Sequence, residues 1–171
     1  DDPRESAYYL CANRNKRSAA IDMATPAGAD LIRRLAAQAD VLVENFKVGS
    51  LAKYGLDYAS IAAINPRIVY CSVTGFGQDG PYANRGGYDF LAQGMGGLMS
   101  VTGEADGPPL KVGVAMADLA TGMYATVSIL AALRHAERTG EGQQIDISLL
   151  DTQIAMLANQ ASSYLVGGVV P

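Results

Sequence analysis

One carboxylate of this sequence stands where only small and apolar side chains surround it. Asp118 lies in the segment VGVAMADLATGMYA, residues 112–125, at the start of a long run with helical spacing. Burying an unpartnered carboxylate costs several kcal/mol or shifts its pKa. Asp118 is therefore either a capping residue of the helix or the reactive group of an enzyme.

The expected helix begins near Met116, so Asp118 lies in its first turn, where the helix dipole and free N–H groups favour an anion. Capping alone would explain an acid at this position. Gly122 lies one turn later on the same face and leaves room for a ligand. A carboxylate that is kept ionised by a helix N-terminus and shielded from bulk water is a competent nucleophile. The residues alone leave both interpretations open.

Two further segments are candidates for ligand binding. The glycine-rich loop TGFGQDGPYANRGGYD, residues 74–89, could bring N–H groups to phosphates or carbonyls, although its spacing favours ordinary turns and no dinucleotide fingerprint is present. Tyr88 in this loop could orient a bound carboxylate through its hydroxyl. The basic cluster NRNKRS, residues 13–18, fits either a solvated loop or a dock for phosphate groups.

Composition limits the classes of function. The chain has 171 residues, of which 49% are hydrophobic, and its net charge of −4 argues against nucleic acid as a partner. No apolar run is expected to reach the roughly 18 residues of a membrane span, and the first residues lack the pattern of a signal peptide. We therefore expect a cytoplasmic protein, or one of the mitochondrial matrix in a eukaryote.

Metal chemistry has little support in the sequence. The single histidine, His135, lies in the last turns of the expected long helix, which argues against a multi-histidine site. Cys11 and Cys71 have no metal-binding spacing and are expected to be reduced core thiols. No metal site and no resident cofactor are expected.

Short strand-like runs alternate with longer helical runs, which predicts an α/β fold with a largely parallel sheet and flanking helices. Thr25 followed by Pro26 indicates a helix start, and Gly140 indicates the end of the long helix. The expected strands are residues 18–22, 40–46, 68–73 and 143–150. The expected helices are residues 25–39, a short one within 48–55, 57–64, 89–99 with Asp89 as N-cap, 116–138, and a final helix ended by Gly167 and Gly168.

The order of the motifs resembles that of the class III CoA-transferases, the family that includes the formyl-CoA and carnitine CoA-transferases. The resemblance runs from Asn13 to about Leu165. It rests on the segments NRNKRSAAIDM, ADVLVENFKVGSLAKYGLD, INPRIVYCSVTGFGQDGPYANRGGYDF, QGMGGLMSVTG, KVGVAMADLATGMYA and RTGEGQQIDISLLD.

The resemblance implies the central part of a Rossmann-like large, CoA-binding domain for residues 1–171. An N-terminal strand–helix segment and a C-terminal small domain, both present in the family, are expected to be missing here. The family also forms interlocked homodimers, so the complete protein is expected to do so.

Family roles carry over to individual positions. Asp118 matches the catalytic aspartate. The residues that match the adenine pocket of CoA are Ile21, Asp22, Met23 and Ala24, and those along the rest of CoA are Asn45, Phe46, Lys47 and Lys53. The loop where the thiol end of CoA meets the acyl group matches Gly86, Gly87, Tyr88 and Asp89.

Departures from the family pattern bear on substrate and reaction. Ala24 stands where the formyl-CoA branch has a lysine, so Lys16 or Arg17 could supply the phosphate contact instead. Racemases of 2-methylacyl-CoA carry a histidine at the position of Tyr88, and racemisation needs a second acid/base, so transfer is favoured. The loop is similar to that of the branch acting on succinate and glutarate derivatives, with Gly86 in place of alanine. A racemase and a non-catalytic ligand-binding domain remain the alternatives.

The resemblance and thioester chemistry together imply one route. Ionised Asp118 attacks the acyl-CoA and forms a mixed anhydride, and the released thiolate then attacks the aspartyl carbonyl. An acceptor carboxylate reverses these steps. A thiolate, whose thiol has a pKa near ~8.5, leaves without a general acid. Coenzyme A is thus a substrate, and the expected partners are an acyl-CoA and a free carboxylic acid.

Overall fold

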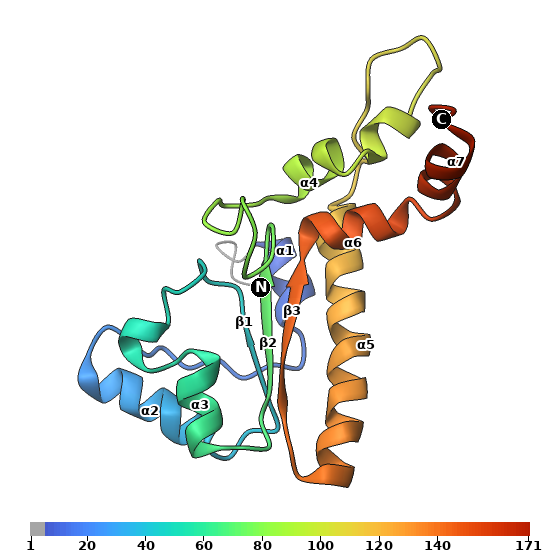
Figure 1. The fold of residues 1–171 in the computed structure, drawn as a ribbon. Coiled ribbons are helices and arrows are strands. Elements are labelled where there is room, and N and C mark those ends of the chain that lie inside the picture. Colours follow the sequence, from blue (N-terminus) through green and yellow to red (C-terminus); the bar gives the residue numbers. More distant parts are fainter. Residues whose placement is uncertain (1–5) are drawn as a thin grey trace.

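A computed structural model describes residues 6–171, and a parallel three-stranded sheet lies at its centre (Figure 1). The strands lie in the order β1–β2–β3, which confirms the predicted α/β class. They are β1 (Val41–Glu44), β2 (Val69–Thr74) and β3 (Gln143–Ser148). The helices are α1 (Ala7–Asn13), α2 (Pro26–Ala36), α3 (Tyr58–Ile64), α4 (Asp89–Met95), α5 (Met116–Thr139), α6 (Leu149–Met156) and α7 (Asn159–Gly167), with 3₁₀ turns η1 (Ala52–Tyr54) and η2 (Leu98–Val101).

Helices cover both faces of the sheet. In Figure 1, α2 and α3 lie on one side of the strands and α5 lies on the other. Successive side chains of a strand point to opposite faces. Tyr70 of β2 therefore packs in the cluster formed with α2 and α3, and Val69 packs against Ala132 and Ala136 of α5. Burial on both faces explains why β2 is an almost uninterrupted run of buried residues.

The carboxyl ends of the strands meet at one edge of the sheet because all strands are parallel. Figure 1 shows helix α4 and the start of α5 at this same end. Gly140, with a φ of 80°, ends α5 at the opposite end, as the sequence predicts. Ligands of open α/β sheets bind beyond the carboxyl ends of the strands, so a site is expected at the edge that holds the start of α5.

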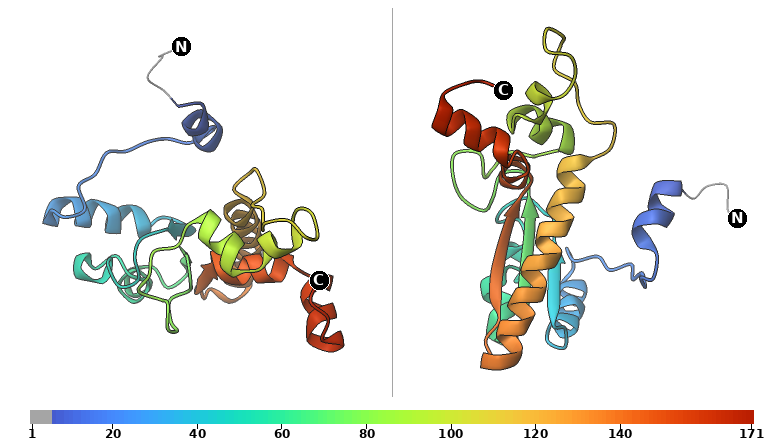
Figure 2. Two further views of the ribbon diagram at one scale, coloured as in Figure 1. Left: turned by 90° about the horizontal axis from the view of Figure 1, so that it is seen from above. Right: turned by 90° about the vertical axis from the view of Figure 1, so that its right-hand side faces the viewer.

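The segment before α2 differs from the prediction. The strand expected at residues 18–22 does not form, and these residues are exposed coil apart from half-buried Ile21. Figure 2 shows α1 and the chain that follows it standing away from the sheet. A strand needs a hydrogen-bonded neighbour, and no described strand lies beside this segment. Cys11 lies on α1, which has no buried residue, and is exposed, so a core thiol is confirmed only for Cys71.

The two outer strands also differ from the prediction, β1 in its burial and β3 in its length. Strand β1 lies at the edge of the described sheet, so it is half-buried and Val43 is 57% exposed, whereas a buried strand is expected. Strand β3 ends at Ser148, two residues before the predicted end. The side chain of Ser148 accepts a hydrogen bond from the N–H of Asp151 and thereby starts α6.

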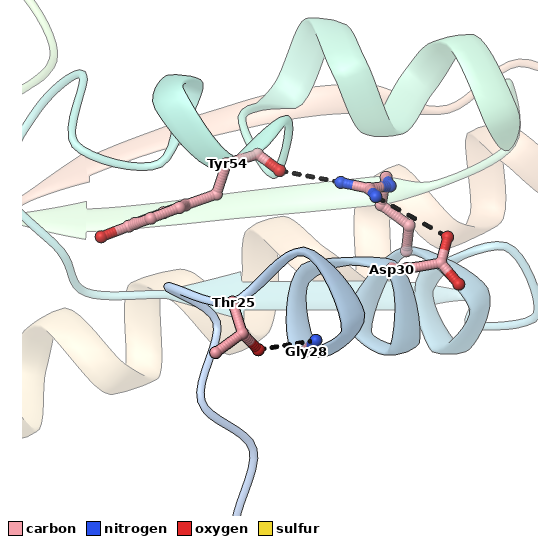
Figure 3. Close-up of polar contacts among 5 residues, drawn as sticks. Thr25, Gly28, Asp30 and Tyr54 are labelled. Carbon is pink, nitrogen blue, oxygen red and sulfur yellow. Dashed lines mark hydrogen bonds and ion pairs between the residues drawn. The ribbon is translucent and has the colours of Figure 1, made fainter.

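The start of α2 confirms its sequence signals. Figure 3 shows Thr25 with its hydroxyl turned toward Gly28, whose N–H donates to Thr25 Oγ1 at 3.1 Å. Pro26 occupies the first helical turn. Arg33 donates from Nη1 to the carbonyl oxygen of Tyr54 at 2.9 Å and so ties α2 to η1. This contact fixes η1, and with it the chain that follows β1, against α2.

Two helices are shorter than predicted. Helix α4 ends at Met95, since Gly97 has a φ of 85°, in the left-handed region where an α-helix cannot continue. The single helix expected at the end of the chain is divided into α6 and α7. Ala158 between them has a φ of 44°, which no α-helix accommodates.

Helix α5 corrects the prediction that no segment has the length and apolarity of a membrane span. By those two criteria alone this helix qualifies, with a mean hydropathy of 1.4. One side packs on the sheet through Ala132 and Ala136. Core helices of soluble proteins also meet these criteria, so the finding is weak evidence for a membrane. The prediction failed because a few glycine and hydroxyl residues do not make the run polar.

Candidate active site

Asp118 lies in the first turn of α5 and lines a cleft of about 400 Å³. In residues 6–171 no basic side chain forms an ion pair with its carboxylate. The cleft brings together segments that are far apart in the sequence, and its other lining residues are Asn45, Val73, Gly75, Gly87, Tyr88, Asp89, Thr121, Gly122 and Leu149. An unpaired carboxylate thus faces an opening large enough for a small ligand.

The shielding of Asp118 from bulk water, expected from its apolar neighbours, is wrong for this chain. Asp118 is an exposed residue. The apolar side chains near it point outward from the sheet, and Leu119 and Met123 are 57% and 58% exposed. Only the inner side of this turn is covered, where Ala117 is completely buried. Asp118 therefore lies at the boundary between the packed helix start and the open cleft.

The surroundings of Asp118 favour its neutral form. Burial of part of the carboxylate raises the pKa of Asp118, and the nearby Asp89 carboxylate raises it further. A more basic carboxylate is a stronger nucleophile once it is ionised. Because the nucleophile must be ionised, any reaction of Asp118 slows as the pH falls through this raised pKa.

Asp89 corrects a predicted role. Tyr88, rather than Asp89, is the N-cap residue of α4, and Asp89 lies in the first turn. Its Oδ1 accepts hydrogen bonds from the N–H groups of Ala117 at 2.7 Å and of Asp118 at 3.2 Å. Asp89 therefore caps α5, the helix of the candidate nucleophile, from another element.

Two glycines that line the cleft, Gly75 and Gly87, bring two backbone segments into close contact. Gly75 follows β2 and lies against Gly87 of the loop, so closely that a Cβ on Gly75 would lie 2.5 Å from the Cα of Gly87. This backbone contact places Tyr88 and Asp89 next to the end of β2. The sequence showed the glycines but could not show which of them touch.

Replacing Gly75 by alanine should destabilise the fold by about 1–3 kcal/mol, because backbone cannot move aside as a flexible side chain can. Gly86→Ala is the matched control, since a Cβ at Gly86 meets nothing within 4 Å. Urea unfolding of both variants measures the difference. Equal stability of the two variants would contradict the close backbone contact.

A second cleft, of about 310 Å³, adjoins the first and shares Asn45, Gly75, Gly87 and Tyr88 with it. The predicted residues Phe46, Lys47 and Gly86 line this second cleft. It also contains Arg85, which the sequence analysis did not select. The guanidinium of Arg85 lies 4.7 Å from the ring centroid of Tyr82, which orients it by a cation–π contact.

The remaining predicted residues line neither cleft. Residues 21–24 form the turn before α2, where the N–H of Ala24 donates to Asp22 Oδ1 at 3.0 Å and Met23 packs against the core. Lys53 Nζ lies 4.7 Å from the ring centroid of Tyr54. The structure thus brings the predicted acyl-end residues to Asp118 and leaves the predicted adenine-end residues apart from them.

The family model described as CoA-transferase family III matches residues 1–171. The chain belongs to CoA-transferase family III. It is 58% identical to the succinate–glutarate CoA-transferase of Agrobacterium fabrum, over 97% of this chain and 42% of the relative. It is 49% identical to the human succinyl-CoA:glutarate CoA-transferase, over 95% of this chain and 37% of the relative.

A solved structure agrees with the fold. A CaiB/BaiF family protein from Brucella suis superposes with a TM-score of 0.95 at 55% identity, over 97% of this chain and 44% of that one. The family resemblance and the fold class inferred from the sequence are thereby confirmed. The chain spans less than half the length of these three relatives.

Proposed function

We propose that this chain supplies the nucleophile of an enzyme that transfers coenzyme A from an acyl-CoA to a free carboxylic acid, with dicarboxylates as the acids. The observation that carries the proposal is the Asp118 carboxylate at the wall of a ligand-sized cleft, without an ion-pair partner among residues 6–171. Membership of family III and the similarity to succinate–glutarate CoA-transferases support it.

The proposed steps conserve atoms and electrons without any added proton or oxidant. An Asp118 oxygen forms a bond to the thioester carbon, the C–S bond breaks, and CoA leaves as a thiolate with the electron pair. The thiolate attacks the aspartyl carbonyl of the mixed anhydride, which releases the donor carboxylate and leaves an aspartyl-CoA thioester. The acceptor carboxylate attacks that thioester, and the same steps in reverse give the new acyl-CoA and free Asp118.

Water must be kept from the anhydride, and the exposure of Asp118 in this chain bears on how that is done. We propose that residues 1–171 are the central part of the large domain of a longer enzyme, whose small domain closes over the cleft. The outward apolar side chains of α5, among them Leu119, Met123 and Val127, would be covered in an interlocked homodimer. Activity is therefore to be measured on the longer enzyme that contains these residues.

The second cleft supports a dicarboxylate as the acid. Lys47 and Arg85 both line it, and neither forms an ion pair with an acidic side chain in the described residues. An acid whose first carboxylate reacts at Asp118 could place its second carboxylate toward these cations, since Tyr88 lines both clefts. Guanidinium groups bind carboxylates in a bidentate manner, which makes Arg85 the better candidate.

Tyr88→Phe should raise the KM for the acceptor acid several-fold and change kcat little, because the hydroxyl would help to orient the bound carboxylate. Tyr88 is 79% exposed and lines both clefts, so the fold does not depend on its hydroxyl. Tyr164→Phe, on helix α7, is the matched control. An unchanged KM in Tyr88→Phe would contradict the assigned role.

The test of the function is a panel of acyl-CoAs and free acids, assayed by the appearance of the new acyl-CoA. Transfer with release of the donor acid is the expected result. A racemase would instead exchange the α-hydrogen of a 2-methylacyl-CoA with D₂O, and a binding domain would retain CoA without turnover. Either of these outcomes, without transfer, would overturn the proposal.

A further inference from the structure

Gln93 of α4 is a completely buried polar residue next to the candidate nucleophile. Its Nε2 donates to Oδ2 of Asp89 at 2.7 Å and to the carbonyl oxygen of Val114 at 3.3 Å. Its Oε1 accepts from the N–H of Val112 at 2.9 Å. Every hydrogen bond of this amide thus goes either to Asp89 or to the segment that leads into α5.

The start of α5 depends on these contacts. Ala115, at the N-cap position, has no side chain that could cap the helix. The N–H groups of Ala117 and Asp118 instead donate to Oδ1 of Asp89, while Gln93 holds the other oxygen of the same carboxylate. Gln93 therefore fixes both the capping carboxylate and the chain that enters the helix.

We propose that Gln93 is a positioning residue for the nucleophile: it locks the Asp89 carboxylate onto the first turn of α5, which fixes the direction of Asp118 toward the cleft. This inference rests on the proposed function. Small displacements of a reacting group lower the rate strongly, so a nucleophile at the end of a helix needs such a fixed start.

The hydrogen bonds that hold the Asp89 carboxylate at the first turn of α5 also keep its negative charge near Asp118. The titratable groups that line the cleft with Asp118 are Asp89 and Tyr88, and the cations Lys47 and Arg85 line the adjoining cleft. Removing the Asp89 charge should lower the pKa of Asp118, because the like charge disfavours the ionised form. The acid side of the pH profile then reports whether Asp89 is in place.

The experiment compares substitutions of two buried glutamines in the longer enzyme that contains these residues. Gln93→Met removes the amide and retains the volume. Gln153→Met is the matched control, because Gln153 is also completely buried but its amide has no hydrogen-bond partner in the described residues. We expect kcat to fall about 10- to 100-fold in Gln93→Met with KM unchanged, and to stay unchanged in Gln153→Met.

The pH profile separates positioning from general damage to the fold. Asp89→Asn should move the acid limb of kcat/KM to lower pH, and this shift should become smaller in the Gln93→Met background, where Asp89 loses the hydrogen bond from Gln93. Equal kinetics of the two glutamine variants, or an equal shift in both backgrounds, would overturn the inference. If Gln93→Met does not fold, Gln93→Glu keeps an acceptor for Val112, loses the donor to Asp89, and should show the same loss of kcat.

A readout independent of activity separates this inference from the proposed function. Hydrogen exchange at the amides of Ala117 and Asp118 should become faster in Gln93→Met and stay unchanged in Gln153→Met. Faster exchange in a protein without transferase activity would refute the function and leave the positioning role. Unchanged exchange in a protein with normal transfer would refute the positioning role alone.

Discussion

Asp118→Asn should abolish CoA transfer, with a loss of at least about 10³-fold in kcat, because the acyl–enzyme bond of the proposed route forms on the Asp118 carboxylate. Asparagine has almost the shape of aspartate and removes the repulsion with Asp89, so the start of α5 should remain intact. CoA binding should therefore persist. Isotope exchange of labelled CoA between acids measures the loss, and calorimetry with CoA measures the retained binding.

Chemical trapping gives the same prediction a direct readout. Incubation of the wild-type protein with acyl-CoA and hydroxylamine should inactivate it and convert Asp118 to a hydroxamate, which peptide mass spectrometry locates. Asp118→Ala should show no adduct at any acid. A hydroxamate on Asp89 in place of Asp118 would mean that the wrong carboxylate has been assigned. Substantial transfer by Asp118→Asn would refute covalent catalysis at this position.

The sequence could predict the location of Asp118 because the signals involved are local. The long helical run from Met116 to Gly140 defines a helix start, and Asp118 lies two residues after that start. Thr25 with Pro26 and the apolar run at Val69–Thr74 are local in the same sense. Each of these features lies within a few residues of its cause, and the structure confirms each one.

The partner of Asp118 could not be predicted in the same way. Asp89 caps α5 by accepting a hydrogen bond from the N–H of Ala117, which lies 28 residues later in the chain. An aspartate at the start of a helical run is typical of an N-cap, so the sequence pattern pointed to α4. Only the packing of α4 against α5 shows which helix receives the carboxylate. Gln93, one turn after Asp89 on the same helix, is a polar residue among apolar ones, and this was the one local signal of the contact.

The failures at residues 18–22 and in β1 have a common physical cause. Strand formation and strand burial depend on neighbouring strands and covering helices, which a local pattern does not specify. Residues 18–22 have the composition of a strand but no partner strand among the described residues. Val43 is an apolar residue typical of a core, but it lies on the edge strand of the described sheet and is exposed. Helices, whose hydrogen bonds are internal, were located better.

Arg85→Gln should lower kcat/KM for dicarboxylate acceptors about 10²-fold and leave monocarboxylates of the same chain length nearly unchanged. A charge-assisted hydrogen bond contributes about 1.5–3 kcal/mol, which corresponds to roughly 10- to 150-fold in binding. Arg85→Lys should restore only part of the preference, because lysine cannot form the bidentate contact. The measurement compares glutarate with valerate as acceptors.

Arg67→Gln is the matched control, because it changes the net charge by the same amount. Arg67 precedes β2 and therefore lies at the opposite edge of the sheet. This substitution should leave the ratio of the two acceptors unchanged. If Arg85 instead holds a phosphate of CoA, Arg85→Gln should raise the KM of every acyl-CoA equally, and the preference for dicarboxylates should remain. The ratio of glutarate to valerate therefore decides between an acid-binding and a CoA-binding role for the cation that the structure places beside Tyr88.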